Sequence, residues 1–210
     1  MEHSVSVLML PGWTNSGPDH WQSHWERAHP EYQRVQQENW DVPDPKAWLE
    51  RIGAAVNHRL FPIVLVGHSL GCIASVSWAA GADARSVGQI LGAFLVAPAD
   101  TERENAPEVL HPWRPVPLIR LPFPSVVVAS RTDDSASFAR SEQFARAWGS
   151  KLIDAGDAGH IHTAAGYGPW PEGERLLADF LARLRADRSN QARGCVISPK
   201  SKNRTPENDL

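Results

Sequence analysis

The stretch that decides the fold is IVLVGHSLGC, residues 63–72. Its first part, Ile63–Val66, is apolar and mostly β-branched, which is typical of a strand buried on both faces. The motif Gly-His-Ser-Leu-Gly follows at 67–71, and a run of helical character covers 70–80. In this G-x-S-x-G pattern the serine occupies a sharp strand-to-helix turn, because the glycines leave room for the backbone to reverse. The motif therefore predicts that the Ser69 hydroxyl stands exposed at the carboxyl end of the sheet.

Outward from this motif, short apolar runs alternate with helix-like segments. We expect strands at 5–10, 32–39, 63–66, 90–96, 125–129 and 151–154, and helices at 18–28, 45–59, 70–80, 138–148 and 172–186. Such alternation favours crossover connections and a mostly parallel central sheet with helices on both faces. The predicted fold class is therefore α/β. No insertion between the strands is long enough to form a cap domain.

The chain of 210 residues fits one domain at 1–186, followed by a polar segment at 187–210 that we expect to be a disordered tail. Within the domain, the stretch 100–124 contains six prolines. Because proline stiffens the backbone and removes a hydrogen-bond donor, this composition predicts a long surface connection between two strands.

Composition excludes several classes of function. The 21 Lys and Arg residues face 24 Asp and Glu, so there is no basic excess to bind nucleic acid or an anionic membrane. No apolar run approaches the ~20 residues that span a bilayer, and the first residues show no signal peptide pattern. The two cysteines, Cys72 and Cys195, do not make a disulfide framework or a zinc site. We expect a cytoplasmic protein, whose oligomeric state the sequence leaves open.

A nucleophilic serine needs a base, and the base needs an acid that orients it. Asp133 follows the predicted strand at 125–129, and His160 follows the one at 151–154. Since the carboxyl ends of parallel strands meet at one edge of a sheet, these side chains should lie near Ser69. The sequence therefore predicts a triad of Ser69, Asp133 and His160.

Neighbouring residues compete for these roles. Asp134 is adjacent to Asp133 and stays an alternative for the acid. His162 lies two residues beyond His160, which we favour as the base because it follows a glycine in a tight turn. His68 precedes the nucleophile, and we expect its side chain to point away from the reacting face. His20 and His24 have the i, i+4 spacing of metal ligands, but no third ligand accompanies them, so we expect no metal.

The oxyanion hole should use two backbone N–H groups. Leu70 supplies one at the start of the helix that follows the serine. The other should come from the glycine-containing loop after the first strand, at 11–15, and we favour Trp13. Trp13, Asn15 and Trp170 are the expected substrate-binding residues, with the two tryptophans as apolar walls of a small pocket.

Five segments carry a resemblance to a known family: LPGWTNSGPDHWQSHWE (10–26), VGHSLGC (66–72), FLVAPAD (94–100), VVVASRTDDSASF (126–138) and DAGDAGHIHTAAGYGPWPEG (154–173). In these the chain resembles the small serine hydrolases of the retinoblastoma-binding-protein-9/YdeN type, within the α/β-hydrolase superfamily. The resemblance implies a compact α/β-hydrolase fold without cap domain or cofactor, with Ser69 as nucleophile and His160 as base. The family's acid segment typically has the pattern S-x-N-D-P. Here SRTDD at 130–134 aligns Asp133 with the acid and puts Asp134 in place of the proline.

Together these features predict a carboxylesterase-like serine hydrolase. It would act on a small-molecule ester, thioester or activated amide through an acyl-enzyme intermediate. Two other functions remain open. One is a non-catalytic protein-interaction module on a hydrolase scaffold, because a fold does not fix a function. The other is a peptidase or an acyltransferase, because both use the same triad.

Overall fold

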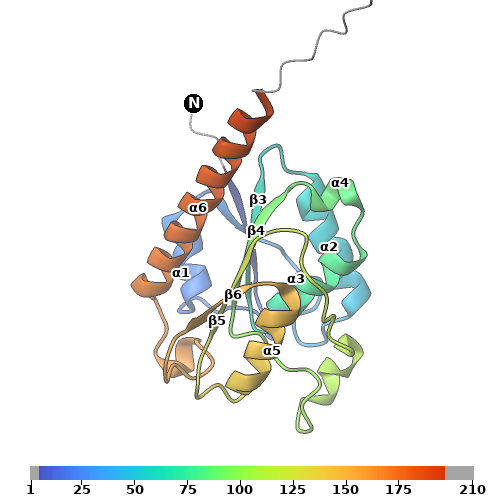
Figure 1. The fold of residues 1–210 in the computed structure, drawn as a ribbon. Helices are drawn as coiled ribbons and strands as arrows, with labels where there is room; N and C mark the ends of the chain where they lie inside the picture. Colours follow the sequence, from blue (N-terminus) through green and yellow to red (C-terminus); the bar gives the residue numbers. More distant parts are fainter. Residues whose placement is uncertain (1–4, 197–210) are drawn as a thin grey trace, which may run out of the picture.

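The fold is built on one six-stranded sheet in the order β2-β1-β3-β4-β5-β6, with every pair of neighbours parallel (Figure 1). This computed structural model describes residues 5–196. The strands are β1 (Ser6–Leu10), β2 (Tyr32–Arg34), β3 (Ile63–His68), β4 (Ile90–Val96), β5 (Ser125–Ala129) and β6 (Lys151–Asp154). The arrangement confirms the predicted α/β class, and parallel pairing places all six carboxyl ends at one edge.

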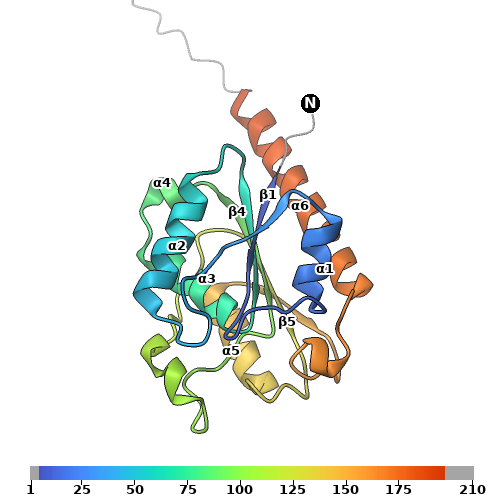
Figure 2. The same ribbon diagram turned by 180° about the vertical axis from the view of Figure 1, so that it is seen from behind.

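Alternate residues of each strand face opposite sides of the sheet, which divides the core into two layers. One layer packs against α2, α3 and α5 and includes Leu8, Leu65, Leu95 and Val127. The other packs against α1 and α6 and includes Met9, Val66, Phe94 and Val128. Figures 1 and 2 show the two groups of helices on opposite sides of the sheet. Both faces are therefore covered, which explains why the central strands have no polar face.

The α-helices that flank the sheet are α1 (Trp21–Ala28), α2 (Pro45–Asn57), α3 (Leu70–Gly81), α4 (Ala84–Val87), α5 (Phe138–Trp148) and α6 (Pro171–Val196). Helix α4 was not predicted from the sequence, because it is too short to show a helical period and is marked by the Asp83 cap alone. Helix α1 begins three residues later than predicted, because His20 occupies its N-cap. Strand β2 also ends earlier than predicted.

Helix α6 continues ten residues beyond the predicted end at 186. Its first turn carries Glu172 and Glu174, which favour a helix N-terminus through their charge. The stretch 187–196 lacks clear apolar periodicity but contains good helix formers such as arginine, glutamine and alanine, so it prolongs the helix. The first part of the expected tail is thus helical, and 197–210 lie outside the described residues. Among the helices described, none combines the length and apolar character needed to cross a bilayer.

We had expected the proline-rich stretch between β4 and β5 to be a surface connection between two strands, but part of it packs into the core. It forms a 3-10 helix, η1 (Glu108–Trp113), whose Leu110 and Trp113 are buried in the α3 layer. The Trp113 indole N–H donates to the carbonyl oxygen of Pro43 at 2.9 Å.

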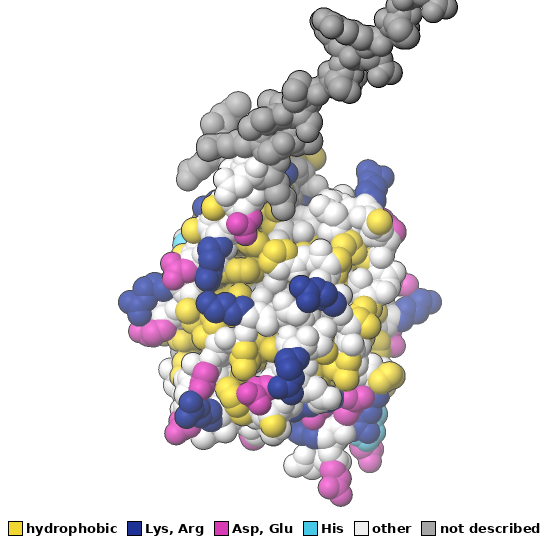
Figure 3. All heavy atoms as spheres, in the orientation of Figure 1, with side chains coloured by type: hydrophobic (Ala, Val, Ile, Leu, Met, Phe, Trp, Pro, Cys, Tyr) yellow, Lys and Arg dark blue, Asp and Glu magenta, His cyan; other side chains and the backbone are white. Residues whose placement is uncertain are grey.

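A second 3-10 helix, η2 (Thr163–Ala165), lies between β6 and α6. On the face shown in Figure 3, charged side chains of both signs are interspersed.

Candidate active site

Ser69 lies between β3 and α3 in a strained backbone conformation, with φ 54° and ψ −122°. A positive φ is rare outside glycine, asparagine and aspartate and is kept where surrounding structure enforces it. Here the Ser69 N–H donates to the Val96 carbonyl oxygen at 3.0 Å, and the Cys72 N–H donates to the Ser69 carbonyl oxygen at 3.0 Å. Gly71 lets this turn press against β1, because a Cβ there would lie 2.0 Å from the Leu10 carbonyl oxygen.

His160 and Asp133 are hydrogen-bonded partners on the loops that follow β6 and β5. The Nδ1 of His160 lies 2.8 Å from Asp133 Oδ1 and 3.0 Å from Oδ2. The carboxylate side chain is only 2% exposed, and its Oδ1 also accepts from the Ser135 N–H at 2.8 Å. Because a carboxylate accepts, His160 Nδ1 must be the donor, which leaves Nε2 free to accept a proton.

Asp134 lies near this pair but is exposed. Its carboxylate accepts from the Ser135 hydroxyl at 3.2 Å and makes no described hydrogen bond with His160. The ligand atoms of Asp133, Asp134 and His160 lie within 4.8 Å of one another, close enough for a cation. However, His160 Nδ1 already donates to Asp133, so it offers no lone pair there. The geometry therefore pairs His160 with Asp133 and leaves Asp134 a turn residue.

Two hydroxyl groups join the loop of Asp133 to the loop of His160. Ser130 Oγ accepts from the Ala158 N–H at 2.9 Å, and Thr132 Oγ1 accepts from the Gly159 N–H at 3.0 Å. Both bonds connect loops that are 27 or 28 residues apart in sequence. They fix the backbone on either side of the acid–base pair. This role was not predicted from the sequence, although both hydroxyl groups belong to the segment 130–134 that contains the acid.

The loop after β1 passes directly over Ser69. A Cβ on Gly12 would lie 2.7 Å from Ser69 Cβ and 3.2 Å from its Oγ, so only glycine fits there. In the described part of the chain, neither the Trp13 N–H nor the Leu70 N–H donates a hydrogen bond. Two unused backbone donors therefore belong to residues beside the serine, since Leu70 follows it in the chain and Trp13 lines the same cavity. The Trp13 indole is held separately, through its N–H bond to the Asp41 carbonyl oxygen at 2.9 Å.

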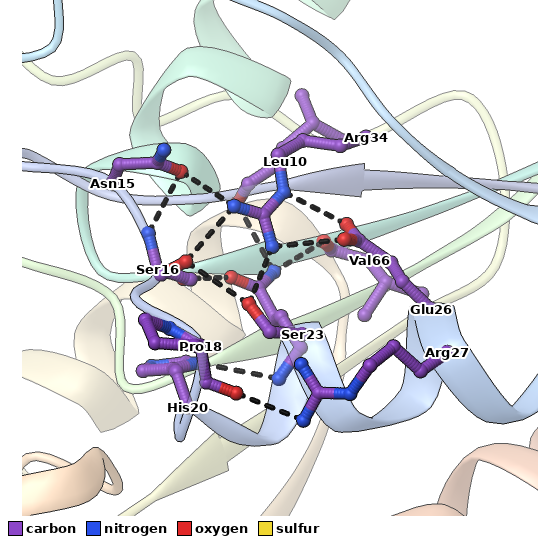
Figure 4. A network of polar contacts seen from close by, with 11 residues as sticks. Leu10, Asn15, Ser16, Pro18, His20, Ser23, Glu26, Arg27, Arg34 and Val66 are labelled. Carbon is purple, nitrogen blue, oxygen red and sulfur yellow. Dashed lines mark hydrogen bonds and ion pairs between the residues drawn. The ribbon is translucent and has the colours of Figure 1, made fainter.

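Arg34, on β2, holds the far part of this loop in place (Figure 4). Its guanidinium donates to Asn15 Oδ1 and to the Ser16 carbonyl oxygen, both at 2.9 Å. It also donates to Ser23 Oγ at 2.7 Å and to both carboxylate oxygens of Glu26, at 2.9 and 2.8 Å. The planar guanidinium can serve so many acceptors because its donors are fixed in a fork. One side chain thus joins the loop, β2 and α1.

Ser69, His160, Trp13 and Asn15 line one cavity of about 230 Å³ at the carboxyl edge of the sheet. Another side is closed by Leu110 of η1 and by Arg103 and Pro107, which precede this helix in the chain. Trp170 does not line this cavity, so the expectation that it forms a substrate wall was wrong. It is 7% exposed and packs against Trp21 and Trp25, with ring centroids 5.3 and 5.7 Å away. Its role is to pack the loop before α6 against α1.

Three further histidines, His20, His68 and His162, line the same cavity as His160. The ring of His68 lies 4.8 Å from that of His20 and 4.9 Å from that of His160. We had expected the His68 side chain to point away from the site. Instead, its Nε2 lies 3.0 Å from the His160 carbonyl oxygen. Burial lowers the pKa of His20 to about 3 and holds the pKa of His68 well below its usual value. Both imidazoles are therefore neutral at pH 7.

A sheet with a strained serine turn at its carboxyl edge, and a hydrogen-bonded histidine and aspartate beside it, defines an α/β-hydrolase. A family model described as serine hydrolase matches residues 7–179. The chain therefore belongs to this serine hydrolase family, and it is a hydrolase. No curated protein matched it.

Solved structures agree with this assignment. A protein described as a YdeN-like hydrolase, from Pectobacterium atrosepticum, is 35% identical with a TM-score of 0.76, over 86% of this chain and 92% of that one. The ydeN gene product of B. subtilis is 19% identical with a TM-score of 0.71, over 85% of this chain and 100% of that one. A thermophilic esterase from Thermogutta terrifontis is 17% identical with a TM-score of 0.63, over 87% and 91%. The first of these confirms the YdeN-type resemblance, and the other two share the fold.

Proposed function

We propose that the protein hydrolyses small esters, thioesters or activated amides through an acyl-enzyme on Ser69. The observation that carries this proposal is the 2.8 Å bond between Asp133 and His160 Nδ1, with His160 and the strained Ser69 in one cavity. His160 Nε2 takes the hydroxyl proton as Ser69 Oγ forms a bond to the acyl carbon. The proton then passes to the leaving group as its bond to the acyl carbon breaks. Water then attacks the acyl carbon as His160 Nε2 takes one of its protons. His160 returns this proton to Ser69 Oγ as the bond between Oγ and the acyl carbon breaks, which releases the acid and restores the free serine.

The oxyanion of the tetrahedral intermediate would accept from the Leu70 and Trp13 N–H groups. Both are unused donors next to Ser69, and Leu70 begins α3, whose positive dipole end favours a negative charge. Backbone donors cost little reorganisation during the reaction, because the turn and Arg34 already hold them. Loss of one such donor costs about 3–4 kcal/mol of barrier in enzymes of this kind.

The substrate is small, because the cavity of about 230 Å³ holds only a short acyl group with part of its leaving group. Trp13 and Leu110 supply apolar surface, and Asn15 stands in the wall with its amide oxygen bound to Arg34. The described esterase of Thermogutta terrifontis shares this fold and supports an ester as the substrate class. A metal or cofactor has no part in the proposed steps. A cytoplasmic location fits the free, buried thiol of Cys72.

A non-catalytic interaction module is the rival function. It gives no reason for a strained serine, a buried acid–base pair and two unused N–H donors to meet in one cavity, since each of these costs stability. A peptidase or an acyltransferase would use the same machinery. An assay with an added amine or alcohol acceptor separates these from an esterase, because an acyltransferase forms a new ester or amide instead of the free acid.

Labelling with a fluorophosphonate probe, followed by peptide mapping, tests the proposal. We expect an adduct on Ser69 that disappears in Ser69→Ala and falls sharply in His160→Ala. Ser135→Ala is the matched control, because Ser135 lines the same cavity without a role as nucleophile. Folded wild-type protein that stays unlabelled, and hydrolyses no short-chain aryl ester, would contradict the proposal and favour the interaction module.

A further inference from the structure

Among the described residues, two histidines that line the cavity each have a ring nitrogen without a hydrogen-bond partner in the protein. These nitrogens are Nε2 of His20 and Nδ1 of His162, and both atoms are enclosed. His20 is only 6% exposed. A buried polar group without a partner is destabilising, so native proteins rarely keep one that no ligand or water satisfies. Two such atoms in a cavity that also contains Ser69 and His160 are therefore candidate contacts for a polar group of a ligand.

The tautomer of His20 is fixed by the helix that it caps. Its Nδ1 accepts a hydrogen bond from the Gln22 N–H at 3.1 Å, so Nδ1 carries no proton. The ring is neutral at pH 7, because burial and then the nearby His162, Arg34 and His160 lower its pKa to about 3. A neutral ring without a proton on Nδ1 carries it on Nε2. His20 Nε2 is therefore a hydrogen-bond donor, and it has no lone pair for a metal ion.

His162 is the natural counterpart. It lines the same cavity as His20, and after burial it makes the largest contribution to the lowered pKa of His20. Its ring centroid lies 5.5 Å from that of His160, at the edge of the acid–base pair. In the tautomer that carries the proton on Nε2, the unpartnered Nδ1 of His162 is an acceptor. The residues that line this one cavity thus offer one donor and, in that tautomer, one acceptor.

We propose that the cavity recognises a hydroxyl group on the acyl part of the substrate. The hydroxyl oxygen would accept a hydrogen bond from His20 Nε2–H, and the hydroxyl O–H would donate a hydrogen bond to His162 Nδ1. A hydroxyl fits because it is a donor and an acceptor at one atom, whereas a carbonyl or an ammonium satisfies only one of the two nitrogens. This inference rests on the proposed acyl-enzyme chemistry and names its substrate class, esters of short hydroxy acids.

The position of His20 indicates where the hydroxyl lies on the acyl chain. The His20 ring contacts the His68 ring at 4.8 Å, and the His68 ring is in turn 4.9 Å from that of His160. His20 is therefore one ring removed from the base and does not face the scissile carbonyl directly. A hydroxyl on carbon 2 or carbon 3 of the acyl group would reach between the two imidazoles while the carbonyl carbon stays at Ser69.

Matched pairs of 4-nitrophenyl esters test this directly. The 2-hydroxypropanoate is compared with the 2-methylpropanoate, and the 3-hydroxybutanoate with the 3-methylbutanoate, because a methyl group replaces the hydroxyl at similar volume. Each ratio of kcat/KM is divided by the ratio of the alkaline hydrolysis rates. We expect a corrected preference of at least ~10-fold for the hydroxy ester in one pair, since a site built for a hydroxyl rejects the analogue that leaves its groups unpaired.

Variants then assign the preference to the two histidines. His20→Asn keeps an oxygen that can cap α1 but loses the ring donor, so the preference should fall to near 1. His162→Leu should abolish it too, whereas His162→Asn keeps an acceptor near the Nδ1 position and should retain most of it. His24→Asn is the control: it lies one turn along the same helix and outside the cavity, so the ratio should stay unchanged.

The outcomes separate this inference from the proposed function. Turnover of the methyl esters with a corrected ratio near 1 in the wild type would overturn the hydroxyl site and leave the acyl-enzyme proposal standing. A preference that survives both His20→Asn and His162→Leu would also overturn it. No turnover of any of the four esters by folded protein would overturn the acyl-enzyme proposal, and the hydroxyl site with it. Thermal unfolding of each variant shows whether a loss of the preference results from misfolding. The His20 and His162 variants test the site independently of each other.

Discussion

His68 Nε2 lies 3.0 Å from the backbone carbonyl oxygen of His160, 92 residues further along the chain. A carbonyl oxygen can only accept, so the imidazole donates its Nε2–H. The residue before the serine thus holds the backbone of the residue proposed as the base. Because burial keeps the pKa of His68 well below its usual value, the ring is neutral at pH 7. The link also connects the end of β3 to the loop after β6, and so fixes two parts of the site relative to each other.

Replacing His68 should therefore reduce turnover through the position of His160. We expect His68→Leu to lower kcat by about 10- to 100-fold with a smaller effect on KM, since a misplaced base weakens the transition state more than the bound substrate. His68→Gln places an amide N–H near the Nε2 position and should recover most of kcat. Steady-state kinetics on a short aryl ester measure both. Equal losses in the two variants would argue that only the volume of the ring matters.

The two neighbouring aspartates should differ sharply. Asp133→Asn removes the charge that fixes the His160 tautomer, and we expect kcat to fall by about 10³- to 10⁴-fold. Asp134→Asn, the same chemical change one residue along, should alter kcat by less than about threefold, because Asp134 is exposed and, among the described residues, its carboxylate accepts only from Ser135. Kinetics of both variants, with circular dichroism to verify folding, make the comparison. A larger loss in Asp134→Asn would reverse the assignment of the acid.

The parts of this molecule that sequence predicts well are those with a local signal. The apolar strands and the G-x-S-x-G turn depend on residues adjacent in the chain, so the strand at 63–66 and the helix after it appear in the structure nearly as expected. Asp133 and His160 could be placed because parallel strands bring their carboxyl ends to one edge. Their hydrogen bond joins residues 27 apart, yet each has its own strand as a marker.

The parts that sequence predicted poorly depend on contacts without such a marker. Trp170 lies in a loop rich in glycine and proline, and this composition suggested a residue of the pocket wall. In the structure its ring packs in the core against Trp21 and Trp25. Two contacts could not be predicted from the sequence, because a histidine has no preferred place in a fold. They are the hydrogen bond from His68 to His160 and the helix cap made by His20. Arg34 gave no signal either, since its five acceptors come from four separate residues in the first 26.

Arg34 supports a prediction of its own. Arg34→Lys keeps the charge but loses the fork that serves Asn15, Ser16 and Glu26 together, so the loop over Ser69 should loosen. We expect kcat to fall by about 10-fold or more while a fluorophosphonate still labels Ser69 slowly. Arg175→Lys is a suitable control, because that exposed arginine on α6 makes one ion pair with Glu172. Unchanged kinetics in Arg34→Lys would mean that the loop is held without the network.

The protein should begin to lose stability as the pH falls below about 6.5, which is above the pH range in which carboxylates titrate. In the unfolded chain His20 takes up a proton near its ordinary pKa of 6.5, whereas in the fold its pKa is lowered to about 3. The unfolded state thus binds more protons between these values, so the free energy of unfolding decreases as pH falls. His20 alone accounts for up to about 5 kcal/mol over the whole window, and His68 acts in the same direction.

Urea unfolding at several pH values between 7.5 and 4.5 measures this loss. The decline should be smaller in His20→Asn, because asparagine does not titrate and still caps the helix. His24→Asn is the matched control and should decline as the wild type does. An unfolding free energy that stays constant down to pH 5 would contradict a buried, neutral His20.

The turn at Ser69 should tolerate no side chain at Gly71. A Cβ there would lie 2.0 Å from the Leu10 carbonyl oxygen and 2.7 Å from that of Pro11, and both are backbone atoms that cannot move aside. Gly71→Ala should therefore force α3 away from β1, with a loss of about 3 kcal/mol or more in the free energy of unfolding. Gly81→Ala, at the other end of α3, meets no atom within 4 Å and should leave stability unchanged or raise it by up to about 1 kcal/mol. Urea unfolding of the two variants decides: similar stabilities would mean that the helix start can shift, and that the strained serine does not depend on this contact.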